Sequence, residues 1–270
     1  MLLNLLYTLT VIFILICVIS LILITVFYYQ TRKRTARYYD NSNLQLHYFI
    51  QKQVDSQNNV IGYECLLRQR DSDGTWRLPP DLQGMPLQYS LKLLEETFNE
   101  LPNEPYQLSI NLSHEQIASH EFPLFVRWAV SKIEPMTLIV DYRPKANLTW
   151  IQKQRFLHNI KLAKSANMKL AIDNVDTTIK TLKTMKYLIP VSSIIKCPVA
   201  DFRKEDGSQW LELNLQFWNN LAKNHHLELI LTGIETPADE ALAKQLQIKF
   251  RQGYLIGRPT KNATSTEVQP

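Results

Sequence analysis

The sequence predicts an α/β protein, a (β/α)8-type barrel preceded by a single transmembrane helix. Three observations lead to this fold class. The first 29 residues are almost continuously apolar, short apolar runs alternate with segments of helical period from residue 106 onward, and polar residues recur where the apolar runs end. Strands that alternate with helices indicate parallel βαβ units, and a long series of such units fits a closed barrel better than an open sheet.

Composition and charge narrow the class further. The chain has 270 residues, of which 45% are hydrophobic and 20% are charged, as in globular proteins. Its net charge is +5, but Arg32, Lys33, Arg34 and Arg37 supply four of these charges, so +1 remains for everything else. A nearly neutral barrel argues against nucleic acid as a partner.

Residues 1–29 are predicted to form one transmembrane helix. The segment can cross a hydrocarbon core of roughly 30 Å at about 1.5 Å per residue. It lacks the basic start and small-residue cleavage site of a signal peptide. The basic residues follow the segment, so the positive-inside rule places the rest of the chain in the cytoplasm, at the cell membrane. The alternative is a long buried core helix.

Three further segments complete the predicted domain organisation. Residues 30–43 are expected to be a basic juxtamembrane linker, residues 44–262 the barrel, and residues 263–270 a polar tail. Cys17, Cys65 and Cys197 show no CxxC spacing, and two of them lie in strand-like runs. Reduced, buried thiols in a cytoplasmic domain are the simplest interpretation.

The barrel is expected to open with a hairpin. Residues 44–53 and 60–68 have strand patterns, and residues 55–59 between them have turn composition. Turn residues at 71–75 and the prolines at 79 and 80 end the strand pattern. Residues 86–101 then repeat apolar side chains at helical spacing.

An alternating series of strands and helices follows. Strands are predicted at residues 106–112, 136–142, 168–173, 193–197, 227–231, 248–250 and 254–256. Helices are predicted to start at residue 114, where Ser113 can serve as the cap, and to span residues 148–166, 179–187, 210–223 and 237–246. The apolar face of the helix at 148–166 is assigned to Trp150, Ile151, Phe156, Ile160 and Leu162.

Polar residues near the strand ends mark the expected site. Asn111, Asp173, Lys196 and Thr232 each lie at or near the carboxyl end of a predicted strand, the rim at which barrel active sites are assembled. Glu64 lies within the apolar run that ends at Arg68, and a buried carboxylate needs a partner or a metal. His114 and His120 are interpreted as surface helix positions.

Six motifs in matching order then resemble those of the EAL-domain family, bacterial phosphodiesterases and receptors for cyclic di-GMP. The similarity covers residues 44–262, and the motifs are Tyr-Glu-Cys-Leu-Leu-Arg (63–68), Ser-Ile-Asn-Leu-Ser (109–113), Leu-Ala-Ile-Asp-Asn (170–174), Ile-Ile-Lys (194–196), Gly-Ile-Glu-Thr (233–236) and Gln-Gly-Tyr-Leu-Ile-Gly-Arg-Pro (252–259).

The resemblance implies a barrel with one antiparallel strand and a catalytic centre with two Mg²⁺ or Mn²⁺ ions, which hydrolyse cyclic di-GMP to the linear dinucleotide. Hard cations of this kind take oxygen ligands. Carried over by position, the metal ligands are Glu64, Asn111 and Asp173, as parts of a vestigial site. Lys196 and Glu235 take vestigial catalytic roles, and Arg68, Gln252 and Glu64 bind the ligand. Within this set Glu235 would hold a loop, and Arg68 would contact a phosphate.

Several of the family's anionic positions are neutral in this chain. The acidic metal ligand of the third strand is assigned to Ile139, the second of the paired aspartates to Asn174, and an acidic loop residue to Thr232. Pro198 replaces a further aspartate. A shifted register would bring Asp141 near the site instead of Ile139. We therefore expect that the two-metal centre does not assemble and that no cofactor is bound, with Mg²⁺ or Mn²⁺ relevant only to residual activity.

The predicted function is a membrane-anchored, non-catalytic EAL-like signalling module that senses cyclic di-GMP or a protein partner at the membrane. The alternatives are an active or weakly active phosphodiesterase and a nucleotide-independent scaffold that regulates a membrane enzyme. The sequence also leaves open whether the chain forms a homodimer. If no ligand binds, the polar residues are expected to pair among themselves, Lys196 with Asp173 and Arg68 with Glu64.

Overall fold

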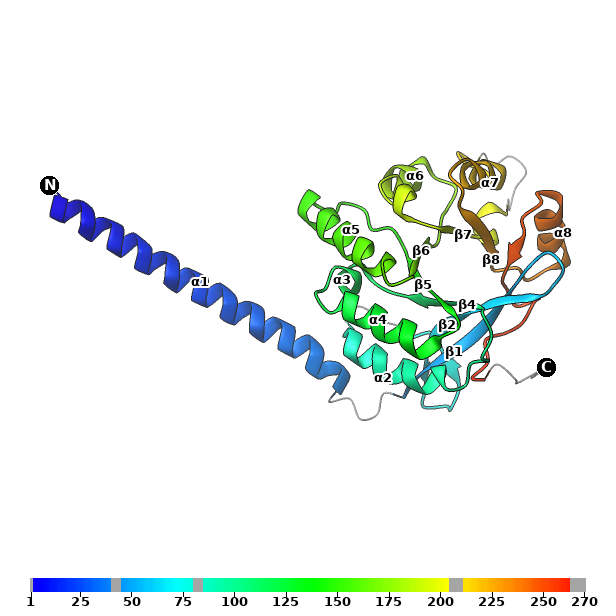
Figure 1. Ribbon diagram of the computed structural model, residues 1–270, viewed down its shortest axis with the longest axis horizontal. Helices are drawn as coiled ribbons and strands as arrows, with labels where there is room; N and C mark the ends of the chain where they lie inside the picture. Colours follow the sequence, from blue (N-terminus) through cyan, green and yellow to red (C-terminus); the bar gives the residue numbers. More distant parts are fainter. Residues whose placement is uncertain (1, 40–44, 80–84, 204–210, 263–270) are drawn as a thin grey trace.

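The computed structural model describes residues 2–39, 45–79, 85–203 and 211–262. It confirms the predicted barrel (Figure 1). The strands lie in the order β1-β9-β8-β7-β6-β5-β4-β2, the pairing of β1 with β2 closes the ring, and β3 adds to the outer end of β2. Their bounds are β1 (Leu46–Val54), β2 (Val60–Arg70), β3 (Trp76–Arg77), β4 (Gln107–Asn111), β5 (Thr137–Tyr142), β6 (Lys169–Ile172), β7 (Ile194–Pro198), β8 (Glu228–Thr232) and β9 (Phe250–Arg251).

One strand of the closed ring runs against the others, as the resemblance implied. β1 is antiparallel to both β2 and β9, whereas the pairings from β2 through β4 to β9 are parallel. The β1–β2 hairpin follows from its turn, because the Asp55 carboxylate accepts the backbone N–H groups of Gln57 and Asn59 at 2.8 and 2.9 Å. The predicted hairpin is therefore confirmed.

Helices connect the parallel strands around the outside of the barrel (Figure 1). Three of them begin with reciprocal capping boxes, Ser113 with Gln116, Thr149 with Gln152 and Thr236 with Asp239, and these fix where each helix starts. The cap at Ser113 was predicted. The helices are α2 (Leu87–Phe98), α3 (His114–Ile117), α4 (Phe122–Ile133), α5 (Trp150–Lys164), α6 (Ile179–Met185), α7 (Leu215–Asn224) and α8 (Pro237–Gln245), with 3-10 turns at Ile189–Val191 and Val199–Phe202.

The barrel interior has an apolar layer toward the amino ends of its parallel strands. Ile139, Ala171, Ile194 and Ile230 are all fully buried and form a cluster of their own, with Phe250 packed against it. The main core lies in the other buried cluster, which includes Phe125, Phe156 and Trp218. The interior layer closes one end of the barrel, so polar side chains collect further along the strands, toward their carboxyl ends.

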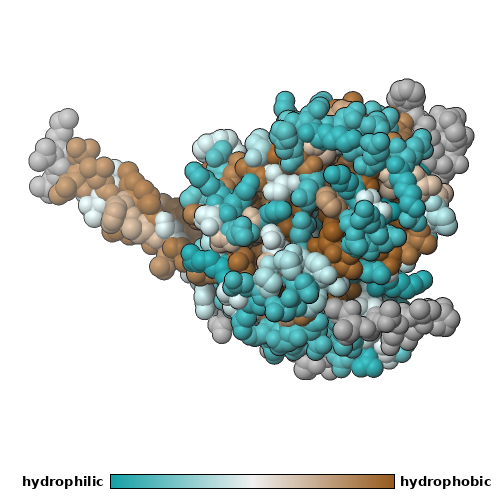
Figure 2. Space-filling model, turned by 45° about the vertical axis from the view of Figure 1, so that its right-hand side comes forward, coloured by the Kyte–Doolittle hydropathy of each residue, from teal (hydrophilic) through white to brown (hydrophobic). Residues whose placement is uncertain are grey.

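The N-terminal helix α1 (Leu2–Tyr39) projects from the barrel (Figures 1 and 2). Its span Leu5–Val26 has a mean hydropathy of 3.2, is long enough to cross a membrane, and contains no buried residue in its apolar window. The helix continues to Tyr39, so residues 30–39, which were expected in a linker, are helical. Residues 40–44 of the expected linker and the expected tail at 263–270 lie outside the described residues.

The prediction of the apolar face of α5 was correct for two of its five residues and wrong for the other three. Phe156 and Ile160 are buried as expected, but Trp150 and Ile151 are 72% and 71% exposed and Leu162 is 45% exposed. The buried face of this helix consists of Phe156, Asn159, Ile160 and Ala163, a spacing that turns Trp150 and Ile151 away from the core.

Three smaller expectations also need correction. Residues 254–256 form a turn rather than a strand. The helix expected at 210–223 begins at Leu215, after the Asn214 cap, and Trp210 lies outside the described residues. His114 is not a surface residue, because it is buried and stacks on the Phe156 ring with 5.4 Å between centroids.

Candidate functional site

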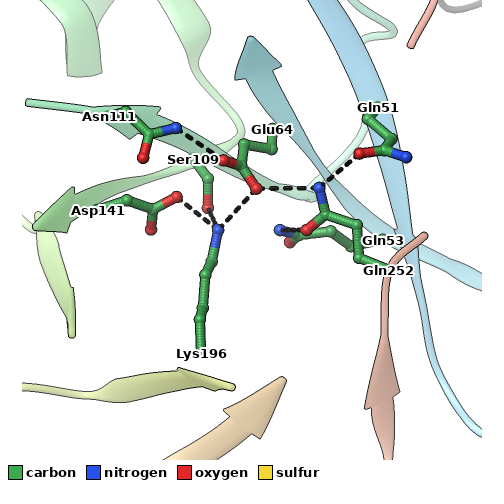
Figure 3. A network of polar contacts seen from close by, with 8 residues as sticks. All are labelled: Gln51, Gln53, Glu64, Ser109, Asn111, Asp141, Lys196 and Gln252. Atoms are coloured by element: carbon green, nitrogen blue, oxygen red, sulfur yellow. Dashed lines mark hydrogen bonds and ion pairs between the residues drawn. The ribbon is translucent and has the colours of Figure 1, made fainter. Parts of the chain in front are cut away.

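A polar cluster, buried except at Asn111, lies inside the barrel at the carboxyl ends of its parallel strands (Figure 3). Parallel strands end at a common rim, so residues distant in sequence meet there. The cluster contains four predicted site residues, Glu64, Asn111, Lys196 and Gln252, and Asp141, which the sequence placed here only for a shifted register. It also contains three residues that were not predicted: Gln51, Gln53 and Ser109.

Lys196 is the centre of the cluster. Its ammonium group is completely buried and donates to Asp141 Oδ2 at 2.5 Å, to Glu64 Oε2 at 3.0 Å and to Ser109 Oγ at 3.3 Å. All three donors of the ammonium group are therefore used. Burial alone would lower the pKa of Lys196, but the Asp141 and Glu64 carboxylates outweigh burial and raise it, so the group is charged.

Glu64 is held by three neighbours. Oε1 accepts Asn111 Nδ2 at 2.7 Å, and Oε2 accepts Lys196 Nζ at 3.0 Å and Gln252 Nε2 at 2.9 Å. Burial works to raise the pKa of this carboxyl, but Lys196 and the two amides together bring it below its usual value. The carboxylate that the sequence left without a partner is therefore ionised and saturated with donors.

A chain of amides ties the cluster to β1. Gln252 Nε2 also donates to Gln51 Oε1 at 3.0 Å, Gln53 Nε2 donates to Gln252 Oε1 at 2.9 Å, and Gln51 Nε2 donates to the Gly257 carbonyl at 2.8 Å. The contacts join the antiparallel strand to the last loop. The alternation of Gln51 and Gln53 in a mostly buried strand was the available signal for an inward polar face.

Asp141 occupies the place that the sequence assigned to Ile139. Asp141 pairs with Asn111 across β4 and β5, whereas Ile139 pairs with Ser109 and belongs to the apolar layer beneath. The shifted register that the sequence left open is the one adopted, and the assignment of Ile139 was wrong.

The surroundings of Asp141 raise the pKa of its carboxyl group. Asp141 is buried, and its Oδ1 has no hydrogen-bond partner among the described residues. Burial, reinforced by Glu64 and Asp173, raises its pKa to about 8 despite the opposing Lys196. Lys196 balances the charge of one carboxylate, Glu64, and Asp141 keeps a proton near neutral pH.

Asp173 follows β6 at the edge of the cluster and is half-buried. Its backbone N–H donates to the Tyr142 carbonyl at 2.9 Å. Burial, together with Glu64, raises the pKa of its carboxyl despite Lys196. The expected pair of Lys196 with Asp173 is replaced by the direct bonds of Lys196 to Asp141 and Glu64.

Arg68 lies above the cluster at the rim. Its guanidinium donates to the Leu67 carbonyl at 3.0 Å, so the expected pair of Arg68 with Glu64 is also wrong. The group is half-buried, and burial lowers its pKa while Tyr254 and Glu64 oppose the shift. Tyr254 is 49% exposed, and the Arg258 guanidinium lies 5.2 Å from its ring centroid. The rim therefore presents two guanidinium groups beside an exposed aromatic ring.

Glu235 lies outside the cluster. Its side chain is exposed, with its carboxylate 3.9 Å from Arg203, and its backbone N–H donates to Asp239 Oδ2 at 3.1 Å. Arg203 in turn binds both carboxylate oxygens of Asp239 at 3.0 and 2.6 Å. Glu235 therefore belongs to the ion pairs that brace the loop between β8 and α8.

The residues present do not fit a centre with two divalent cations. Anionic donors lie on one side of the barrel only, as Glu64, Asp141 and Asp173, whereas β7 and β8 end in Pro198 and Thr232, and Asp173 is followed by the neutral Asn174. Two ions need many oxygen ligands, mostly anionic. Among the described residues no three acidic, histidine or cysteine side chains are arranged to hold one ion, because Lys196 stands between Glu64 and Asp141.

The chain is similar to proteins known for cyclic di-GMP. It is 25% identical over 215 residues to "Probable cyclic di-GMP phosphodiesterase PdeA" of Escherichia coli (strain K12). The aligned region covers 73% of this chain and 28% of that protein. The chain thus spans little more than a quarter of that relative's length.

Solved structures share the fold. "PaMucR Phosphodiesterase, c-di-GMP complex" matches with a TM-score of 0.64 and 22% identity over 80% of this chain and 97% of that one. The Xanthomonas citri FimX EAL domain in complex with c-diGMP matches with a TM-score of 0.64 and 8% identity over 83% and 91%. The Bacillus subtilis YKUI protein, with an EAL domain and in complex with c-di-GMP and calcium, matches with a TM-score of 0.64 and 15% identity over 83% and 58%.

The family model described as "EAL domain" matches residues 34–259, which include every strand of the barrel and every residue of the polar cluster. With the barrel topology and the motifs at its rim, this match shows that the chain belongs to the EAL domain family.

Proposed function

We propose that this protein is a membrane-anchored module that binds cyclic di-GMP at the barrel rim and holds it without rapid hydrolysis. The observation that carries the proposal is the one-sided arrangement of carboxylates around Lys196. Glu64 and Asp141 are both bound to the ammonium group, and the opposite strands end in neutral residues. Hydrolysis by two cations needs enough anionic oxygen ligands to hold both ions.

Ligand binding is supported by the rim. Cyclic di-GMP carries two phosphodiesters and two guanine bases. Arg68 and Arg258 offer planar donor forks for phosphate, and the exposed Tyr254 ring offers a stacking surface for a base. Relatives of the same fold have been solved in complex with this nucleotide. Gln252 and Glu64, fixed beneath the rim, would limit how deeply the ligand enters.

Membrane attachment is the other part of the proposal. The span Leu5–Val26 has the length and hydropathy of a transmembrane helix. Basic residues follow the span in the sequence, which favours a cytoplasmic barrel. Protease added to sealed, right-side-out spheroplasts should then leave the barrel intact, and cleavage of the barrel under these conditions would contradict this orientation.

The binding test is calorimetric titration of cyclic di-GMP into the full chain in detergent, with and without Mn²⁺. Saturable binding is expected, and Arg68→Ala should raise Kd by about tenfold to a hundredfold, as expected for loss of a charged hydrogen bond to phosphate. Lys223→Ala, at an exposed position at the end of α7, is the matched control and should leave Kd unchanged. Absence of heat at high micromolar nucleotide would favour the nucleotide-independent scaffold.

A weak phosphodiesterase is the second candidate, and Asp141 is the observation in its favour. Asp141 adds a carboxylate next to Asn111, and its Oδ1 is unpaired within the described part of the chain. A single Mg²⁺ or Mn²⁺ ion would supply Lewis-acid stabilisation of phosphoryl charge, but it could reach Glu64, Asn111, Asp141 and Asp173 only if Lys196 left Glu64 and Asp141. Slow formation of the linear dinucleotide that is abolished by Glu64→Ala would establish this candidate.

A further inference from the structure

The outer surface of α5 and the start of α6 combine exposed apolar side chains with cations. Trp150 and Ile151 are 72% and 71% exposed at the start of α5, and Ile179 is 42% exposed at the start of α6. Lys153, one helical turn after Trp150, lines the same pocket as Ile179, so the starts of the two helices share one surface. Exposed apolar groups that share a surface mark an interaction site. The sequence had assigned Trp150 and Ile151 to the core, and nothing in the nucleotide site uses them.

A basic cavity of about 690 Å³ lies between these helices. Four of its ten lining residues are lysines, and Glu212 is the one acid among them. The Glu212 carboxylate accepts the Ile179 backbone N–H at 2.8 Å. Lys145 is paired with Glu115 at 2.6 Å, and Lys153 lies 5.2 Å from the centre of the Tyr187 ring. The remaining two, Lys180 and Lys183, have no salt-bridge partner among the described residues.

The sequence of this region also carries only positive charges. Residues 142–172 contain seven lysine and arginine residues and no aspartate or glutamate. On α5, Arg155 is exposed between Ile151 and Leu162, so cations and apolar side chains share the outer face of the helix. Basic side chains beside an exposed tryptophan suit the headgroup region of an anionic bilayer.

We propose that this surface docks the barrel onto an anionic lipid bilayer. The docking face consists of Trp150, Ile151, Lys153, Ile179, Lys180 and Lys183. The apolar side chains enter the headgroup region, and the lysines bind lipid phosphates. A symmetric contact with a second copy would place lysines against lysines, which disfavours that occupant. The proposal rests on the membrane attachment proposed above, because α1 would hold the barrel close to the bilayer.

Docking would also reach the nucleotide site. α5 follows the strand that carries Asp141, and α6 follows the segment that carries Asp173. The docking face therefore belongs to the same two βα units as two carboxylates of the site.

The test uses the full chain in nanodiscs at one copy per disc, made of phosphatidylcholine with or without phosphatidylglycerol. Brief acetylation followed by mass spectrometry gives the reactivity of each lysine. Anionic lipid attracts these lysines to the bilayer, and docking covers their amino groups. Lys153, Lys180 and Lys183 should therefore react roughly tenfold more slowly in the anionic discs. Lys223 and Lys249, both exposed near the opposite end of the barrel, should react equally in both discs.

Variants separate docking from other effects. Trp150→Ser with Ile151→Ser should restore the reactivity of the three lysines, whereas Leu124→Ser, at a 58% exposed position on α4, should leave them protected. Equal reactivity of the three lysines in both lipids would overturn the proposal. Protection that needs two copies per disc, whatever the lipid, would assign the face to a second copy and would also overturn it.

Failure of the anchor would be recognised separately. If α1 does not insert, the full chain stays outside the discs, and flotation with preformed vesicles becomes the readout. Flotation with phosphatidylglycerol vesicles that is lost in Trp150→Ser with Ile151→Ser would still support the docking face. No flotation with these vesicles, or equal flotation with phosphatidylcholine alone, would overturn it.

Discussion

Replacing Lys196 with methionine removes the charge around which the barrel interior is organised. Methionine keeps much of the volume of the side chain but none of its three donors, which reach Asp141, Glu64 and Ser109 at 2.5, 3.0 and 3.3 Å. Lys196 and Asp141 are both completely buried in their side chains, so water cannot replace the lost contacts without rearrangement. Removal of one partner from a buried ion pair costs about 3–5 kcal/mol, and we expect Lys196→Met to lower the free energy of unfolding by that amount.

Urea unfolding of the full chain in detergent, followed by tryptophan fluorescence, measures the loss. Lys223→Met, the same substitution at an exposed position, should change the free energy of unfolding by less than about 0.5 kcal/mol. Adding Glu64→Gln to Lys196→Met removes the carboxylate that is left without a counter-charge and should recover about 1–2 kcal/mol. A Lys196→Met variant as stable as the parent, or single effects that simply add, would refute the assignment of Lys196 as the counter-charge.

Three further predictions concern stability. The pKa of Asp141 is raised to about 8, so its contribution to stability is full below the pKa of the unfolded chain and is lost as the pH rises through about 8. The difference in free energy of unfolding between the parent and Asp141→Asn should therefore shrink between pH 5 and 8, by at most about 1.4 kcal/mol per pH unit. A difference that does not change with pH would contradict this. Arg203→Gln should lower the free energy of unfolding by about 1–2 kcal/mol at pH 7, a value reduced because Arg203 is 39% exposed. The pKa of Asp239 is lowered in the folded chain, so this loss should shrink in acid as Asp239 becomes protonated, which thermal melts at several pH values would measure. Trp218→Phe should cost about 1–2 kcal/mol through loss of the bond from Trp218 Nε1 to the Asp176 carbonyl at 3.0 Å, and an unchanged urea midpoint would exclude that role.

Much of the barrel could be predicted from the sequence because its signals are local. Alternation between apolar strand runs and helical periods identified the parallel units, and Asp55 and Ser113 have the side-chain chemistry that starts a turn and a helix. The polar strand ends identified Glu64, Asn111, Lys196 and Gln252 before their contacts were known. These residues meet because parallel strands share a rim, which is a property of the fold class.

The remaining features depend on register and on packing between distant segments. A two-residue shift on one strand exchanges Asp141 for Ile139 without changing which face is inward, so strand pattern alone could not separate them. The partner of Lys196 is chosen by three-dimensional proximity, and Asp141 and Glu64 lie 55 and 132 residues away in sequence. Trp150 and Ile151 look like core residues by type, but the offset of the α5 stripe turns them to solvent.

The most direct test of the central claim is a single-turnover experiment with the full chain in excess over cyclic di-GMP, in the presence of Mn²⁺. Bound and free nucleotide are separated, and the chemical form of the bound fraction is followed over hours. We predict that cyclic di-GMP is bound and stays cyclic, because Lys196 occupies the space between Glu64 and Asp141 and the strands opposite end in neutral residues. Conversion of the bound nucleotide to the linear dinucleotide within minutes, abolished by Glu64→Ala, would contradict it.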